Sequence, residues 1–300
     1  MELINSNDKL GVLVSPDMLL GDAGANINGP SLIRIPDWIP NPLGRYYLYF
    51  AHHEGRYIRL AYSDDLLGPY RIHRPGSLRL DQCRKVGGHI ASPDVHIDYE
   101  RRRIVMYFHG PSRAMKRQMS YRAESIDGIN FAPTGGELGI FYFRAWAYDG
   151  AHYALGKARL YRSDNGGRSF TEGPSVLEVT GSGRDLNEPG NIRHIAVRVR
   201  GDVLEVYCTL QGEAPEAIRM GKIVMTGNWS DWRMSDPLLV LAPTEAWEGA
   251  ELPSTPSVSG GSYWPEHAVR DPAIYQEGDQ TYLLYTVMGE RGIAIARVPS

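Results

Sequence analysis

Five short segments decide the fold of this chain: YYLYFAHH (46–53), RIVMYFHG (103–110), GAHYALGK (150–157), LEVYCTLQ (204–211) and TYLLYTVM (281–288). Each is rich in apolar, β-forming residues and has the length of one β-strand. Each also carries a tyrosine near its middle: Tyr49, Tyr107, Tyr153, Tyr207 and Tyr285. The tyrosines recur at uneven intervals, which is typical of one structural unit repeated with loops of different length.

Each of these segments is flanked by two further predicted strands. The preceding strands read SLIRI, DVHID, FRAWAYD, IRHIAVRV and PAIYQ, and the following strands read YIRLAYS, RQMSYRAES, ARLYRSD, AIRMGKIVM and GIAIARV. Almost no stretch has helical amphipathic spacing, and 33 Gly and 20 Pro are spread along the chain as turn formers. The pattern predicts an all-β, five-bladed β-propeller that occupies residues 1–300 as a single domain. A two-sheet β-sandwich is the competing architecture.

The last predicted blade ends after its third strand, near Val298. Its outer strand is expected to come from KLGVLVS (9–15), so that the N-terminal strand closes the ring and removes its open edge. Two tight turns, SIDGINF (125–131) and SDNGGRSF (163–170), favour the same architecture because Asp or Asn beside Gly permits a positive φ. The second turn also fits the Asp-box pattern of propeller proteins.

Composition limits the classes of partner. With 42% hydrophobic and 22% charged residues and a formal net charge of -3, the chain has no electrostatic preference for nucleic acid or anionic membranes. No segment approaches the ~20 apolar residues of a membrane span, and the first residues lack a secretory pattern, so a cytoplasmic protein is expected. Cys83 and Cys208 are the two cysteines, which excludes a disulfide framework.

In a propeller blade, the start of the first strand and the end of the second strand lie on the same face of the ring. Function is expected on this face, because polar residues gather at both positions. Six of the nine histidines fall there: His52, His53, His89, His109, His194 and His267. The strand starts also supply Asp22, Asn28, Asp94, Arg144, Glu188, Arg193 and Asp271.

The segment PEHAVRDPAIY (265–275) crowds Glu266, His267, Arg270 and Asp271 at the start of one such strand. It ends a long insertion, residues 244–267, that is rich in Pro, Gly and Trp. Insertions of this length inside a compact domain are usually functional, so this one is expected to form a pocket wall. Trp264 or Trp247 would then offer a surface for stacking a sugar ring. A purely structural ion pair between Arg270 and Asp271 is the alternative interpretation.

The strand layout resembles the five-bladed propeller glycoside hydrolases, a group that includes families 43, 32 and 117, with the phosphorolytic family 130 as a further relative. In family 43, strand starts commonly read Asp-Pro, and the general acid is a Glu in a Glu-Gly-Pro segment. RDPAIY keeps the Asp-Pro form at Asp271, and NEPGNIRHIAV places Glu188 at the position of the acid. The starts of blades one and two instead read Gly29-Pro30 and Ser92-Pro93. The nearest substitute carboxylates are Asp94 in blade two and Asp22 in blade one, where Asn28 is a further candidate.

The resemblance implies a glycoside hydrolase that cleaves an oligo- or polysaccharide with two carboxyl groups and inverts the anomeric centre. In such an enzyme a protonated carboxyl donates its proton to the leaving oxygen, and an ionised carboxylate activates the attacking water. We expect Glu188 as the acid, Asp94 as the base and Asp271 as a modulating residue, and family 117 suggests His267 or His194 as an acid. The expected substrate-binding residues are Asn28, His52, His109, Arg144, Arg193, His194, Trp264, Glu266 and Arg270.

Two other functions stay open. In a phosphorylase, Arg144, Lys157, Arg193 and His194 would form the phosphate site. A non-catalytic carbohydrate-binding propeller is favoured by the two missing Asp-Pro starts. An acid and a base that face each other across a pocket would indicate hydrolysis, whereas a basic cluster with one carboxylate would indicate phosphorolysis. No metal site or cofactor is predicted, although a structural cation on the propeller axis and a homo-oligomer are left open.

Overall fold

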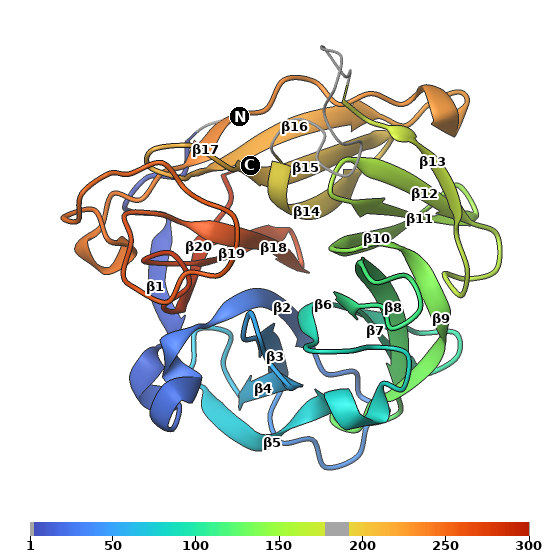
Figure 1. The fold of residues 1–300 in the computed structure, drawn as a ribbon, viewed down its shortest axis with the longest axis horizontal. Coiled ribbons are helices and arrows are strands. Elements are labelled where there is room, and N and C mark those ends of the chain that lie inside the picture. Colours follow the sequence, from blue (N-terminus) through green and yellow to red (C-terminus); the bar gives the residue numbers. More distant parts are fainter. Residues whose placement is uncertain (1–2, 178–191, 300) are drawn as a thin grey trace.

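The computed structural model describes residues 3–177 and 192–299. These residues form five four-stranded sheets that stand as blades around a common axis (Figure 1). The predicted all-β, five-bladed β-propeller is confirmed, and the competing two-sheet sandwich is wrong.

In each blade the strands follow one another from the axis outward and pair antiparallel. Blade one consists of β2 (Asn28–Arg34), β3 (Tyr46–Ala51), β4 (Tyr57–Ser63) and β5 (Arg71–Arg79). Blade two consists of β6 (Ala91–Asp98), β7 (Arg103–Pro111), β8 (Gln118–Ser125) and β9 (Ala132–Ile140). Blade three consists of β10 (Phe143–Tyr148), β11 (Ala151–Gly156), β12 (Arg159–Ser163) and β13 (Thr171–Ser175). Blade four consists of β14 (Ile192–Arg200), β15 (Val203–Leu210), β16 (Ile218–Val224) and β17 (Leu238–Leu241). Blade five consists of β18 (Arg270–Glu277), β19 (Gln280–Thr286), β20 (Ile293–Arg297) and β1 (Lys9–Val14).

Helical structure in the described residues is confined to short 3-10 turns in the connections. These are η1 (Pro16–Met18), η2 (Gly21–Ala25), η3 (Leu80–Gln82), η5 (Trp229–Asp231) and η6 (Ala246–Glu248). None of the described helices has the length and apolarity needed to cross a membrane.

Strand β1 closes the ring, as the sequence predicts. It pairs antiparallel with β20, with Lys9 opposite Ala296 and Val12 opposite Ala294. The buried Lys9 Nζ lies 2.5 Å from Glu248 Oε2 and so ties the start of β1 to the long insertion. Val14 at the other end of β1 is fully buried. The outer edge of blade five is therefore paired rather than open.

The apolar core is divided into five clusters, one at each seam between neighbouring blades. Tyr49 of blade one packs with Met106 of blade two, for example, and Phe50 of blade one lies in the same cluster as Ile295 of blade five. Both faces of each sheet are thereby covered. This is why the middle strands read as nearly continuous apolar runs.

The tyrosine repeat marks the five middle strands but not one equivalent position within them. Four inner strands contain a β-bulge, where two residues of the inner strand oppose one residue of the middle strand. The first pairs after the bulge are Ser31–Tyr49, Asp94–Tyr107, Ile195–Cys208 and Ala273–Leu284. Tyr207 and Tyr285 thus lie one residue to either side of the equivalent position. A shift of one residue moves a side chain to the other face of the sheet.

Ring closure can be tested with one substitution made at two positions of β1. Val14→Ala is expected to lower the free energy of unfolding by about 1–3 kcal/mol, because it empties a buried site between blades five and one. Val12→Ala on the same strand is the control, since Val12 is 40% exposed. It should change the free energy of unfolding by less than about 0.5 kcal/mol. Urea unfolding measures both values. Equal effects would show that β1 is not held in this seam.

Candidate functional site

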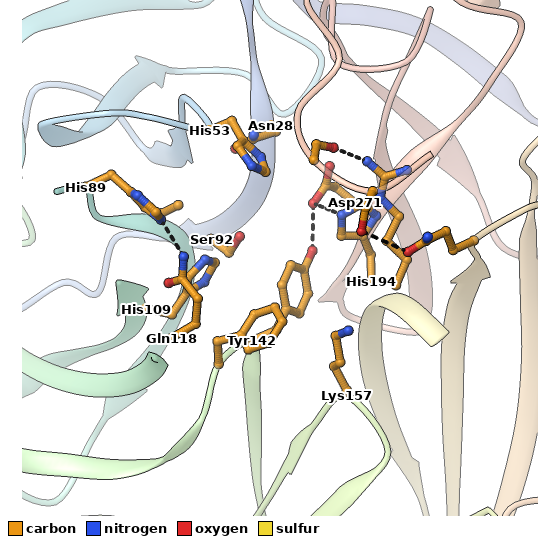
Figure 2. Close-up of a pocket in the computed structure, with 16 residues that line it drawn as sticks. Asn28, His53, His89, Ser92, His109, Gln118, Tyr142, Lys157, His194 and Asp271 are labelled. Carbon is orange, nitrogen blue, oxygen red and sulfur yellow. Dashed lines mark hydrogen bonds and ion pairs between the residues drawn. The ribbon is translucent and has the colours of Figure 1, made fainter. Parts of the chain in front are cut away.

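A polar cavity of ≈ 220 Å³ lies at the end of the axis where the inner strands begin (Figure 2). All five blades contribute to its wall. The described residues with polar side chains in the wall are Asn28, His53, His89, Ser92, His109, Gln118, Tyr142, Lys157, Arg193, His194, Gln211, Ser259 and Asp271. The starts of the inner strands and the ends of the middle strands therefore meet on one face, as the sequence predicts.

Three inner strands begin with the same backbone arrangement. Gly29, Ser92 and Asp271 each precede a proline and have φ values of 58°, 48° and 48°. A positive φ is unfavourable for the two residues that carry a side chain, so the surrounding bulge must hold them there. Ser92 and Asp271 both line the cavity as a result.

The structure explains why blade one has glycine at this position. A Cβ at Gly29 would lie 2.9 Å from the Cα of Ser92, which is closer than real side chains approach. Blade one therefore has no room for a carboxylate where the family-43 resemblance would put one. The Gly29-Pro30 start, which departs from the Asp-Pro of family 43, therefore has a steric cause: the backbone of Ser92 in blade two.

Asp271 is a buried carboxyl in the cavity wall. Its Oδ1 accepts a hydrogen bond of 2.7 Å from the Tyr142 hydroxyl, while Oδ2 has no hydrogen-bond partner among the described residues. Burial, followed by the Glu290 carboxylate, raises the pKa of Asp271 to about 7. The Tyr142 hydrogen bond and the guanidinium groups of Arg193 and Arg144 act in the opposite direction. Asp271 is therefore close to half protonated at neutral pH.

His194 lies beside Asp271, with Nε2 3.5 Å from Asp271 Oδ1 and Nδ1 3.3 Å from the Thr209 hydroxyl. Burial, followed by the charges of Arg193 and Arg270, lowers the pKa of His194 well below its usual value. The histidine is therefore neutral when the carboxyl holds its proton. The exchangeable proton of this pair therefore belongs to Asp271 rather than to His194.

A cluster of three histidines, His53, His89 and His109, lies across the cavity from Asp271 (Figure 2). Neighbouring ring centroids are 6.4 and 6.1 Å apart, and the Gln118 amide lies 3.1 Å from His89 Nε2. Burial, followed by neighbouring imidazoles, lowers the pKa of His89 and lowers that of His109 well below its usual value. These two imidazoles are neutral at pH 7 and can each accept a proton.

Buried charges support the cavity next to Asp271. Arg270 Nε lies 2.6 Å from Glu216 Oε2, and Arg193 Nη1 lies 3.2 Å from the same oxygen. Glu290 Oε1 lies 3.7 Å from Arg193 and 4.0 Å from Arg270. Arg270 also pairs with Glu266. Because these charges compensate one another, the guanidinium groups are held in place rather than offered to a ligand.

Three groups in this region have the spacing of metal ligands. One ligand atom each from His194, Asp271 and Glu290 lies within 4.8 Å of the others. Glu290 Oε2, however, already accepts hydrogen bonds from Asn26 and Asn28. The arginines that face Glu290 also repel a cation. This donor set therefore fits a structural cation poorly.

The long insertion forms one wall of the cavity through a strap that runs from Val258 to Ser262. Arg193 Nη1 donates a 2.9 Å hydrogen bond to the Val258 carbonyl, and Nη2 donates to the carbonyl of Gly260. Asn26 of the blade-one connection donates a 2.8 Å hydrogen bond to the Ser262 carbonyl. Ser259 and Gly260 of the strap line the cavity, as expected of the insertion, and three hydrogen bonds from Arg193 and Asn26 hold the strap against blades four and one.

Of the residues expected to be catalytic or to bind substrate, five line the cavity: Asn28, His109, Arg193, His194 and Asp271. Glu188, the expected acid, lies outside the described residues. Asp94, the expected base, is not in the cavity wall. Its Oδ2 lies 2.7 Å from His96 Nε2 and accepts a hydrogen bond from the Ala145 amide. Burial alone would raise the pKa of Asp94, but His96, Arg144 and the Ala145 amide together outweigh burial, and the pKa is lowered.

The other expected site residues lie around the cavity or beneath it. Arg144 is buried and donates to the carbonyls of Ile195, Ser92 and Phe143. His267 contacts the Pro243 carbonyl, and the His52 ring packs near Tyr263. Trp264 is 80% exposed. Glu266 and Arg270 belong to the buried charge cluster, and Arg270 does not pair with Asp271 as the structural alternative supposed.

Sequence reasoning gave too little weight to Tyr142 and Gln118. Tyr142 has φ 70° and directly precedes β10, so it occupies the start of the blade-three inner strand. Gln118 begins the third strand of blade two, whereas the sequence pattern predicts site residues at the starts of first strands and the ends of second strands. His53, His89 and Lys157 were noted on the correct face, but the sequence could not show which histidines point inward.

No protein-family model matches the chain. The uncharacterized protein R118 of Acanthamoeba polyphaga mimivirus is 33% identical to it over 305 residues, which covers 93% of this chain and 85% of R118. The chain belongs to the R118 family. The fold of this family member is also seen in solved structures with little sequence identity.

Three of these structures share the propeller fold. A putative glycosidase from Bacteroides thetaiotaomicron VPI-5482 matches with a TM-score of 0.65 at 12% identity and covers 99% of this chain and 96% of its own. The GH43_1 enzyme from Xanthomonas citri matches with a TM-score of 0.60 at 12% identity, covering 95% and 91%. A structure from the GH130 family, which contains mannoside phosphorylases and glycoside hydrolases, matches with a TM-score of 0.61 at 13% identity, covering 91% and 84%. The fold of the R118-family chain is therefore that of the five-bladed propeller glycoside hydrolases.

The buried charge cluster predicts a large difference between two arginines. Arg270→Met should lower the free energy of unfolding by about 3–5 kcal/mol, because it removes one of the two arginines that neutralise the buried Glu216 and Glu290 and leaves Arg193 alone against both carboxylates. Arg79→Met is the matched control: Arg79 and its partner Asp81 are 62% and 65% exposed, so the change should be below about 1 kcal/mol. Denaturant unfolding distinguishes the two, and a small loss for Arg270→Met would contradict the compensation described above.

Proposed function

We propose that this protein is a glycoside hydrolase in which Asp271, with the neutral His194 beside it, protonates the leaving oxygen. The observation that carries the proposal is the buried Asp271 carboxyl in the cavity wall, whose pKa is raised to about 7. A general acid is most effective when its pKa lies near the working pH. The propeller fold shared with glycoside hydrolases supports the same class of reaction.

The cavity wall suits an uncharged, hydroxylated substrate. Neutral imidazoles and the side-chain amides of Gln118 and Gln211 both donate and accept hydrogen bonds, as sugar hydroxyls do. The charge of Arg193 is matched by Glu216 and Glu290. A neutral sugar unit therefore meets complementary groups on all sides of the cavity.

In the proposed reaction, Asp271 transfers its proton to the glycosidic oxygen as the bond from that oxygen to the anomeric carbon breaks. A water molecule attacks the anomeric carbon and gives a proton to His89 or His109, which are neutral and lie across the cavity. The products are the free sugar and the alcohol, and the imidazolium then loses its proton to solvent while Asp271 regains one. A histidine replaces Asp94 as base in this scheme, because the Asp94 carboxylate is engaged by His96 and Ala145.

Phosphorolysis is the second candidate function. Apart from Asp271, the described residues of the cavity wall carry no carboxylate, while Lys157 adds a cation beside the charge-matched Arg193. A phosphate ion that replaced water would need no general base.

A panel of aryl glycosides and oligosaccharides, assayed with and without phosphate, tests the proposal and separates it from phosphorolysis. Sugar release in phosphate-free buffer is the expected result. Sugar release that depends on phosphate would indicate a phosphorylase. Sugar binding without turnover would indicate a non-catalytic carbohydrate-binding propeller.

Two aspartates provide a matched pair of variants. Asp271→Asn should lower kcat about 100-fold or more, because the amide cannot donate the proton. Asp94→Asn should leave kcat within about threefold, since Asp94 lies outside the cavity wall, and should lower the melting temperature by weakening the contact with His96. Steady-state kinetics and thermal unfolding check both. An unchanged kcat for Asp271→Asn would remove the acid assignment.

The pH dependence of kcat follows from the raised pKa of Asp271. The general acid must be protonated, so activity should fall as the pH rises through about 7. Tyr142→Phe removes a hydrogen bond that stabilises the ionised carboxylate. The pKa of Asp271 then rises further, and the alkaline limb of the profile should move to higher pH. A shift to lower pH would show that Tyr142 acts in another way.

A further inference from the structure

A second polar cavity of ≈ 380 Å³ lies at the opposite end of the propeller, between blades two and three. Strand β6 runs from Ala91 in the first cavity to Asp98 in the second. Strand β10 likewise starts beside Tyr142 and reaches the second cavity at Ala147. The two cavities are therefore separated by the length of the inner strands, and the proposed hydrolysis uses no residue of the second one.

Most of the charges in and around this second cavity are paired. Three pairs supply them, His96–Asp94, Arg101–Asp98 and Arg122–Glu124, with N–O separations of 2.7, 3.5 and 2.5 Å. Glu100 adds one carboxylate. A wall with paired charges does not select an anion, because no cation is in excess. It does offer several donors and acceptors side by side, which suits a ligand with hydroxyl groups.

Aromatic rings give the cavity a second feature of a carbohydrate site. Tyr107 and Trp146 line it, and Tyr99 lies at its edge with 69% of its surface exposed. The Tyr99 ring meets the Trp38 ring in a T-shaped contact at a centroid distance of 5.4 Å, which supports the ring from one side and leaves most of it exposed. An exposed ring supported in this way is a ready surface for stacking the apolar face of a sugar.

We propose that this cavity is a second binding site for an uncharged sugar unit, with Tyr99 as its stacking surface and Arg101 and His152 as hydrogen-bonding groups. The site would hold a long saccharide on the face opposite the catalytic cavity. It requires carbohydrate as the ligand class but not the assignment of Asp271, so it stands apart from the catalytic proposal.

Native gel electrophoresis in the presence of soluble arabinan, xylan or mannan tests this site on the full chain. Wild-type protein is expected to be retarded by at least one of the three polysaccharides. Tyr99→Ala should weaken this retardation about fivefold or more, whereas Tyr99→Phe, which keeps the ring, should not. Hydrolysis of the aryl glycoside found in the activity screen should stay unchanged in both variants, because a small substrate needs only the first cavity.

Trp264→Ala is the matched control, since Trp264 is an exposed aromatic residue two positions beyond the strap that walls the first cavity. Retardation lost in Trp264→Ala but kept in Tyr99→Ala would overturn the proposal, as would the absence of retardation by all three polysaccharides. Loss of aryl-glycoside hydrolysis in Asp271→Asn with retardation intact would leave this site standing. No hydrolysis by the wild type would instead count against the proposed reaction alone.

Discussion

The pairing of β1 with β20 is the constraint on which the site depends. It joins residues near the start of the chain to its last blade, so that five sheets share one axis. Only in a closed ring do Asn28, His109, Tyr142, His194 and Asp271 line one cavity. The interaction that closes the ring is itself buried, through Val14 and the pair Lys9–Glu248. Closure thus supplies both stability and the convergence of distant polar groups.

Beneath the cavity, buried charges set the chemistry of Asp271. Burial, followed by Glu290, raises its pKa, whereas Arg193 and Arg144 oppose that rise. Arg193 in turn is held by Glu216 and by two carbonyls of the strap. The same network therefore fixes one wall of the cavity and keeps a carboxyl near half protonation. Stability and proton chemistry are coupled through one set of contacts.

The chain shows how a common fold can carry a different site. At the positions where the resemblance to family 43 expects carboxylates, blade one has Gly29 packed against Ser92, and blade two has Ser92 itself. The positive φ and the bulge remain at both positions, so the backbone is kept while the side chain has changed. Histidines from blades one and two occupy this side of the cavity instead. The fold thus does not determine which reaction is catalysed; the side chains in the cavity wall do.

The sequence by itself determined the strands, their grouping into five blades, the closing strand and the face on which polar residues gather. These features follow from apolar patterns and turn residues, which act over a few neighbouring positions. The same patterns identify Asp271 and His194 as candidate site residues, because both lie at strand starts.

The sequence could not determine the direction of each side chain or its partner in the neighbouring blade. Asp94 was expected as the base, yet a bulge turns it toward His96 and the amide of Ala145 in the next blade. Tyr142 reaches Asp271 from 129 positions away in the chain. Such contacts depend on bulge register and ring geometry, which only the tertiary structure decides.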